Sequence, residues 1–299
     1  MNNFHVIITQ TGQIHFVHCI NGNLPVVLAA QKRYLKNFLY ITLCLFCTNL
    51  SAQDNYEIQV YGSETQAPRT TMFELHSNVT VLGFREVQNG VIADNLAWHE
   101  TIEITQGITP WFELGGYLFM SANRGQYGLT YVGDHLRPRF RAPESWHWPV
   151  GVSLSLEAGY QKPRYCADTW TLEIRPIIDK QYKWFYFSFN PVVDYAFVGY
   201  DHKAGLQFSP DLKLQFNVSK KVAIGLEYYT GIGSFQAPYP LAQQSHQLGP
   251  AFDLDVSPDY EINFGYMFGL TPGTERGIVK LILGRRVDWK PKKAPPQPK

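Results

Sequence analysis

Three arginines at alternate positions are the residues of this sequence best suited to act on a charged solute. Arg137, Arg139 and Arg141 stand two residues apart. Because successive side chains of a β-strand point to opposite faces, all three would share one face of a strand. Guanidinium groups on the inner wall of a pore either pair with carboxylates or form a polar constriction that selects ions. The pattern therefore predicts ion pairing or ion selection at this strand.

Carboxylates and a histidine on neighbouring segments could pair with these arginines. Opposite residues in a hairpin have a constant sum of residue numbers, which places His76 opposite Glu103 and Glu113 opposite Arg137. Cross-strand neighbours stand about 4.5–5.5 Å apart at Cβ, close enough for an ion pair. The candidates for a lumen constriction are Arg137, Arg139, Arg141, Glu113, Glu103, His76, Glu157, Glu173 and Arg175. Further charges expected on the same wall are Glu74, Asp194, Asp211, Lys213, Glu227, Asp253, Asp255, Glu261, Lys280 and Arg286.

No arrangement of residues indicates catalysis or a cofactor. His76 and Ser77 are adjacent, so they would point to opposite faces of a strand and could not act as base and nucleophile. His99 and Glu103 share a face but stand about 13 Å apart along a strand. The histidines lack metal-ligand spacing, and of the four cysteines only Cys166 follows the export signal described below. We therefore expect no enzyme, no cofactor and no metal.

The elements that must position these side chains are β-strands with one apolar and one polar face. Between residues 206 and 218, Leu212, Leu214 and Phe216 alternate with Lys213 and Gln215. A period of two is typical of strands, and it recurs in about twelve segments. The expected strands are 71–84, 95–107, 111–122, 128–141, 148–161, 169–179, 182–198, 205–218, 221–233, 247–256, 259–270 and 276–287.

The connections between these segments alternate in length. Every second one is short, as at residues 180–181, 219–220 and 257–258, whereas residues 234–246 form a long one. Short turns on one side and longer loops on the other are typical of outer-membrane β-barrels, whose short turns face the periplasm. An even number of strands then predicts that both termini lie in the periplasm.

Composition favours a membrane barrel over the alternatives. Aromatic residues make up 15% of the 299 residues, there are 24 glycines, and the mean hydropathy of −0.20 is too low for a helical membrane protein. A soluble β-sandwich also alternates, but its strands seldom run this long with so many Phe and Tyr. The 26 basic and 25 acidic residues nearly cancel, so nothing suggests a nucleic-acid partner. We expect an all-β chain that forms a single closed antiparallel transmembrane β-barrel.

An export signal precedes the expected barrel. Lys32, Arg33 and Lys36 come before the apolar run 38–47, and Ala52 ends a stretch of small residues that a signal peptidase accepts. The run is too short to cross a bilayer as a helix, so we expect cleavage after Ala52. The predicted organisation is an over-extended start at 1–31, a signal peptide at 32–52, a periplasmic segment at 53–70, the barrel at 71–287 and a disordered Lys/Pro-rich periplasmic tail at 288–299.

Two interpretations of the charged wall stay open at the level of sequence. In the first, the charges pair with one another and fill a narrow barrel, because charges removed from bulk water need partners. In the second, they surround a water-filled pore. A barrel of about twelve strands lies between the small barrels that side chains fill and the large ones that conduct. The segment 53–70 could supply a plug, although nothing in its sequence requires one.

Several local segments resemble those of the uncharacterised small, porin-like or transporter-like outer-membrane β-barrel proteins of Gram-negative bacteria. They are the junction Leu50-Ser51-Ala52-Gln53, the segment 57–62 and the first strand, 73–78; the resemblance covers residues 53 to about 287. It implies a protein surrounded by outer-membrane lipid and lipopolysaccharide and inserted by the barrel assembly machinery, and it carries over no catalytic residue. We expect a narrow passive channel for small polar solutes or ions. The alternatives are a closed structural or ligand-binding barrel and, less favoured, an outer-membrane enzyme.

Overall fold

The computed structural model describes residues 4–8, 14–18 and 55–289 of two separate units, Met1–Thr48 and Asn49–Lys299. In the first unit, β1 (Phe4–Ile8) pairs antiparallel with β2 (Ile14–His18). The expected signal peptide lies outside the described residues, as does the expected tail after Trp289, so both stay predictions together with the over-extended start. No helix among the described residues is long and apolar enough to span a membrane.

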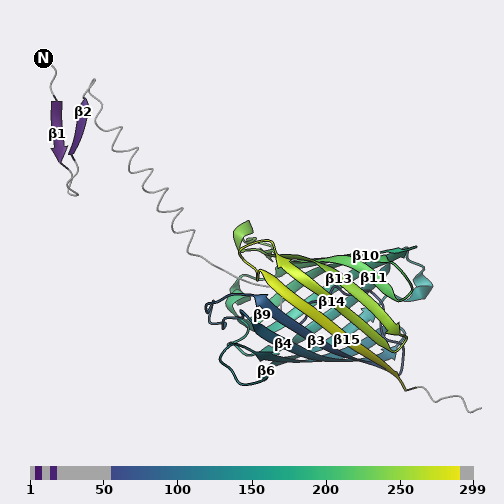
Figure 1. Cartoon of the computed structure of the whole chain (residues 1–299). Coiled ribbons are helices and arrows are strands. Elements are labelled where there is room, and N and C mark those ends of the chain that lie inside the picture. Colours follow the sequence, from purple (N-terminus) through teal and green to yellow (C-terminus); the bar gives the residue numbers. More distant parts are fainter. Residues whose placement is uncertain (1–3, 9–13, 19–54, 290–299) are drawn as a thin grey trace, which may run out of the picture. The chain divides into compact units, whose positions relative to one another are not determined.

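The second unit is a closed antiparallel β-barrel of twelve long strands (Figure 1). The strands are β3 (Thr70–Leu82), β4 (Ala97–Thr109), β5 (Phe112–Ala122), β6 (Thr130–Arg141), β7 (Gly151–Gln161), β8 (Asp168–Tyr182), β9 (Phe185–Gly199), β10 (Gln207–Asn217), β11 (Val222–Gly231), β13 (Ser245–Ser257), β14 (Tyr260–Gly269) and β15 (Gly277–Asp288). Each pairs with its neighbours along the chain, and β15 returns to pair with β3, which closes the barrel. A two-residue strand, β12 (Gly233–Ser234), adds to the pairing of β10. The predicted fold class and number of strands are confirmed.

Alternation along each strand separates an apolar exterior from a polar lumen. On β6, Leu136 is 54% exposed and Arg137 is 2% exposed; on β15, Leu283 is 41% exposed and Lys280 is 0% exposed. In a bilayer the exterior side chains meet lipid, and a closed sheet leaves no unpaired backbone edge in the hydrocarbon. The predicted facing of the strands is therefore confirmed.

Short turns and longer loops alternate between the strands, so the two ends of the barrel differ. The end that carries the turns 110–111, 183–184 and 258–259 is here called the turn end, and the other the loop end. The turn end also carries the 3₁₀ helix η1 (Glu144–Trp146), and the loop end carries η2 (Tyr200–Lys203) and η3 (Leu241–Gln243). The alternation in length that the sequence predicts is present.

Residues 55–69, here called the plug segment, run through the lumen from the loop end to the turn end. Asn55 donates a hydrogen bond to Asp94 in a loop of the loop end. At the turn end, the Arg69 amide donates to the Gly107 carbonyl at 3.0 Å. A Cβ atom on Gly107 would stand 2.1 Å from a carbonyl oxygen of the plug segment, so only glycine fits this crossing. The sequence analysis assigned residues 53–70 to the periplasm and allowed that they could supply a plug; residues 55–69 lie inside the barrel.

The described ends of the barrel unit lie at opposite ends of the barrel. The Trp289 indole donates to Thr71 at 2.7 Å and the Trp289 amide to the Arg69 carbonyl at 3.0 Å, both at the turn end. Asn55 lies at the loop end. The termini themselves lie outside the described residues, so the expectation that both are periplasmic stays a prediction. An even number of strands places only the strand ends together, and the plug segment crosses the barrel before the first strand begins.

The cross-strand register differs by two residues from the one that the sequence predicts. The observed pairs are Glu74 with Glu103, His76 with Thr101 and Glu113 with Arg139. The sum of paired residue numbers depends on where each loop has its midpoint, and a long loop such as 83–96 leaves that midpoint free. A slip of two residues keeps every side chain on its expected face, so the facing is right although the register is wrong.

Candidate functional site in the barrel lumen

Lumen side chains hold the backbone of the plug segment where it enters from the loop end. Thr101 Oγ1 donates to the Tyr56 carbonyl at 2.8 Å. Lys280 Nζ donates to the Ile58 carbonyl at 3.1 Å. Backbone groups taken out of water need such partners, and an extended segment without a neighbouring strand must find them on side chains. The lumen wall of β4 and β15 supplies them here.

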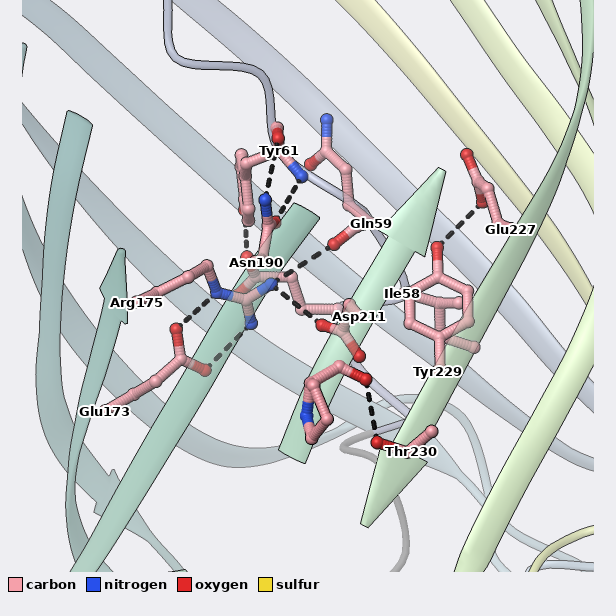
Figure 2. A network of polar contacts seen from close by, with 12 residues as sticks. Ile58, Gln59, Tyr61, Glu173, Arg175, Asn190, Asp211, Glu227, Tyr229 and Thr230 are labelled. Carbon is pink, nitrogen blue, oxygen red and sulfur yellow. Dashed lines mark hydrogen bonds and ion pairs between the residues drawn. The ribbon is translucent and has the colours of Figure 1, made fainter. Parts of the chain in front are cut away.

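The middle of the plug segment is bound in the same way. The Tyr61 amide donates to Asn190 Oδ1 at 2.9 Å, and its carbonyl accepts from Ser188 Oγ at 2.6 Å and from Asn190 Nδ2 at 3.1 Å (Figure 2). One step further, the Ser63 amide donates to Asp179 Oδ2 at 2.9 Å. The polar residues of β8 and β9 therefore fix the position of the segment along the lumen.

The Tyr61 side chain lies among three arginines of the barrel wall. Its ring centre is 4.3 Å from the guanidinium carbon of Arg139. The guanidinium carbons of Arg175 and Arg137 lie 5.1 and 5.2 Å from the same ring centre. The Tyr61 hydroxyl donates to Glu57 of the plug segment. Cation–π contacts of this kind are strongest where water is excluded, so Tyr61 ties the plug segment to the wall of β6 and β8.

Five of the predicted constriction residues form one ion-pair cluster, centred on Glu103 and Glu113. Arg137 contacts Glu103 at 2.5 Å and Glu113 at 3.2 Å. Arg139 lies 3.5 Å from Glu113, and His76 Nε2 lies 3.2 Å from Glu103 Oε2. The contacts of His76 with Glu103 and of Arg137 with Glu113 run diagonally across the strands. The predicted partners therefore meet even though they do not face each other in register.

Arg175 forms a second cluster beside the plug segment (Figure 2). Its guanidinium lies 2.5 Å from Glu173 and 3.2 Å from Asp211. It also donates to the Gln59 carbonyl of the plug segment at 3.4 Å. This arginine therefore joins two carboxylates of the wall to the backbone of the plug segment.

Glu157 and Arg141 lie apart from these clusters. Glu157 contacts His135 at 2.7 Å. Arg141 pairs with Glu144 at 3.3 Å, and its side chain is 23% exposed near the turn end. Arg141 also lies 3.9 Å from Glu64 of the plug segment, so it contacts the segment nearer the turn end than Arg137 and Arg139, which contact the Tyr61 ring.

Sequence reasoning missed an apolar patch of the lumen. Ile58 and Val60 of the plug segment pack against Tyr229, Met267 and Ile278 of the barrel wall. Ile58 and Tyr229 are both fully buried. The alternation of apolar residues at positions 56, 58 and 60 was an available signal. It indicates a segment with one buried face, but it does not identify the partner.

Cavities lie on both sides of Tyr61 and its arginines. The cavity toward the turn end has a volume of about 190 Å³ and is lined by Gln59, Tyr61, Glu74, Glu103, Arg139 and Glu261 among others. The cavity toward the loop end, also about 190 Å³, is lined by Glu57, Glu157, Arg175, Asp194 and Asp211 among others. A third, of about 200 Å³ at the mouth of the loop end, is lined by Asn55, Asp94, His99 and Glu275 among others. The plug segment contributes to the wall of each.

Two loop carboxyls hold the start of the plug segment at this mouth. Asn55 Nδ2 donates to Glu275 Oε1 at 2.9 Å and to Asp94 Oδ2 at 3.2 Å. Burial, and after it the charge of Asp94, raise the pKa of Glu275 to about 8. Burial also raises the pKa of Asp94. The two side chains are also hydrogen-bonded to each other.

No family model and no curated protein matches this chain. Among solved structures, the KdgM porin is 6% identical with a TM-score of 0.48, over 72% of this chain and 98% of that chain. The NanC porin is 7% identical with a TM-score of 0.47, over 71% and 97%. The outer membrane protein Omp33 of Acinetobacter baumannii is 11% identical with a TM-score of 0.40, over 76% and 100%.

The assignment of the fold rests on the strand pairing of this chain itself. Its sheet closes on itself, its exterior is apolar and its interior carries paired charges. A closed antiparallel barrel with an apolar outer band is the form in which β-strands cross an outer membrane. The chain is a closed twelve-stranded outer-membrane β-barrel with its own N-terminal segment in the lumen.

Proposed function

We propose that this protein is an outer-membrane channel for small polar solutes or ions that its plug segment keeps closed. The observation that carries the proposal is the position of Tyr61. Its backbone is bound to Asn190 and Ser188, its ring lies among three arginines, and cavities lie on either side of it. A solute that crosses the lumen must displace this residue.

The plug segment is separable from the barrel. Between Tyr56 and Ser63 its hydrogen bonds go to side chains of the wall, and no strand pairs with it. Each such bond contributes about 0.5–1.5 kcal/mol net, and breaking them leaves the ladder from β3 to β15 intact. A filling that can leave without disturbing the barrel suits a gated channel better than a purely structural barrel.

The wall that remains after the segment leaves is polar and already paired. The ion pairs of Glu103 with Arg137 and of Asp211 with Arg175 would persist, because both partners of each pair belong to strands. Lys280 likewise keeps Glu227. Charges that are paired across a narrow lumen leave a passage lined by polar atoms, which admits small hydrated solutes.

We assign the turn end to the periplasm, because the short turns of outer-membrane barrels lie on that side. Asn55 then lies at the outer mouth, where Asp94 and Glu275 bind it. The exterior meets outer-membrane lipid and lipopolysaccharide, and insertion by the barrel assembly machinery follows from the same architecture.

Single-channel conductance in a planar bilayer tests the proposal. We expect the unaltered protein to be mostly closed and Tyr61→Ala to open in reproducible steps, because the substitution removes the side chain that the three arginines hold. Tyr127→Ala is the matched control, because Tyr127 is fully exposed in a loop; it should behave as the unaltered protein does.

Two results would count against a plugged channel. Equal conductance of the unaltered protein and Tyr61→Ala would show that the segment does not close the lumen. Silence of all variants, in protein whose folded state is shown by heat-modifiable migration on gels, would favour the closed structural or ligand-binding barrel.

A further inference from the structure

We infer that Glu74, His76 and Glu103 form a binding site for a divalent transition-metal ion such as Zn²⁺ on the lumen wall. One ligand atom from each, two carboxylate oxygens and an imidazole nitrogen, lies within 4.8 Å of the others. This inference goes beyond the proposed channel and does not depend on movement of the plug segment.

The pairing of β3 with β4 places two carboxylates face to face. Glu74 stands directly opposite Glu103 in the register. Like charges in this position destabilise a sheet. Glu103 has Arg137 as a counter-charge, whereas the Glu74 carboxylate makes no hydrogen bond or ion pair with the described residues. A cation held between the two would remove the repulsion that the register imposes.

The contacts of Glu103 orient its carboxylate toward His76. Arg137 and Thr105 both donate to Oε1, at 2.5 and 2.7 Å. Oε2 lies 3.2 Å from His76 Nε2. Hydrogen bonds to one carboxylate oxygen are how outer-shell residues fix a metal ligand and leave the other oxygen for the ion. Arg137 and Thr105 would be positioning residues for this site.

His76 provides the second observation that points to a ligand. Its side chain is fully buried, and its Nδ1 has no hydrogen-bond partner among the described residues. Buried polar atoms without a partner are uncommon in folded proteins. The imidazole is held on one side only, by Glu103, so it can turn toward an ion between the strands.

The turn-end cavity gives the site an open side. Glu74 and Glu103 line this space of about 190 Å³, together with Glu64, Glu113 and Glu261. Arg137 and Arg139 also line it, and Arg141 and Arg286 pair with Glu64 and Glu261, so that four arginines face five carboxylates. The excess of negative charge favours a cation, and the cavity has room for water in the remaining coordination positions.

The donor set selects the class of ion. Ca²⁺ and Mg²⁺ prefer oxygen ligands alone. A set of one imidazole and two carboxylates suits Zn²⁺ and related ions, which bind nitrogen and oxygen at about 2.0–2.2 Å. Ligand atoms at that distance from one ion stand roughly 3–4 Å apart. Small side-chain rotations from the observed spacing therefore suffice to form the site.

Isothermal titration of Zn²⁺ into the protein, purified from membranes in detergent and treated with a chelator, tests the inference. We expect saturable binding of one ion per chain. Glu74→Gln and His76→Gln should each weaken it by roughly 10- to 100-fold or more. Glu261→Gln is the matched control, since it removes the same charge from the same cavity without touching the three ligands; it should bind as the unaltered protein does.

Three results would overturn the site. They are the absence of saturable Zn²⁺ binding by the folded protein, unchanged affinity in both ligand variants, and an equal loss of affinity in Glu261→Gln, which would reduce the effect to the charge of the cavity. Zinc X-ray absorption of the unaltered protein gives a second readout. One imidazole among nitrogen and oxygen neighbours supports the site, and a spectrum without imidazole contradicts it.

Discussion

At the scale of single residues, the contact of Asn55 with Glu275 at the start of the plug segment depends on the protonation of the Glu275 carboxyl. Burial raises the pKa of Glu275 from its ordinary 4.5 to about 8, so the latched carboxyl keeps its proton at neutral pH. A carboxyl released to solvent loses that proton above its ordinary pKa. Between pH 4.5 and about pH 8, the state in which Glu275 binds Asn55 holds more protons than the state in which the plug segment is released. Rising pH therefore favours release of the segment. The raised pKa of Asp94 acts in the same direction.

We therefore predict that conductance of the unaltered protein rises between about pH 4.5, the ordinary pKa of a glutamate, and about pH 8, the raised pKa of Glu275. Glu275→Gln keeps the hydrogen bond to Asn55 but cannot ionise, so its conductance should depend much less on pH. Glu86→Gln serves as the control, because Glu86 lines the same mouth cavity and is exposed. A Glu275→Gln variant with the pH dependence of the unaltered protein would show that the proton lies elsewhere.

The proposed metal site could not be predicted from the spacing of residues in the sequence. Spacing along the chain gave no metal ligands, because it compares residues of one strand. Pairing across strands brings Glu74 of β3 to Glu103 of β4, and the register that does so differs by two residues from the predicted one. The contact of His76 with Glu103 was predicted and is present, but as a diagonal contact. The side chains of His76 and Glu103 are long enough to meet although the register differs by two residues from the predicted one.

At the scale of elements, each strand separates a lipid face from a lumen face, and substitutions should respect that division. Leu212 and Gln215 belong to β10 and point to opposite faces, while Phe264 of β14 is 40% exposed on the exterior. Arg at the midplane of the lipid face costs about 2–4 kcal/mol. We predict that Leu212→Arg and Phe264→Arg impair assembly and that Gln215→Arg does not.

Folding into lipid vesicles, followed as the fraction of heat-modifiable protein, measures this difference. The pair Leu212 and Gln215 is matched, because the two positions lie close together on one strand. Equal folded fractions for all three variants would contradict the facing of the strands.

Strands were predictable from the sequence because alternation is a local property, but their limits were not. β8 was expected to end at residue 179, since Lys180 and Gln181 are polar and resemble a turn. The ladder continues to the pair of Tyr182 with Phe185, and Lys183 turns the chain with a φ of 52°. A tight turn requires positive φ at such a residue. Polarity alone could not distinguish the last lumen-facing residues of a strand from the turn.

At the scale of the whole molecule, the barrel encloses part of its own chain. From the sequence, residues 53–70 could supply a plug, but the alternation of the strands indicates a polar lumen face and no apolar partner for such a segment. Tyr229, Met267 and Ile278 face inward and cover Ile58 of the plug segment. Such a fit depends on three strands distant in the chain and cannot be seen in any one of them. The closed barrel was predictable; what fills it was not.

The plug segment also bears on whether a barrel of this size can conduct. Twelve strands enclose a lumen that side chains alone need not fill, and Tyr61 of the plug segment lies inside it against Arg139 and Arg175. Conductance then depends on the equilibrium between bound and released plug segment. The barrel itself stays closed as a sheet in both states, because its ladder does not include the segment.

The measurement that tests this account most directly is the single-channel conductance of the protein with and without residues 55–69. The account predicts that the unaltered protein is mostly closed, that the deletion variant conducts steadily, and that a synthetic peptide of residues 55–69 added back blocks it. A deletion variant that is folded by heat-modifiable migration yet as silent as the unaltered protein would contradict it, as would an unaltered protein that conducts equally well.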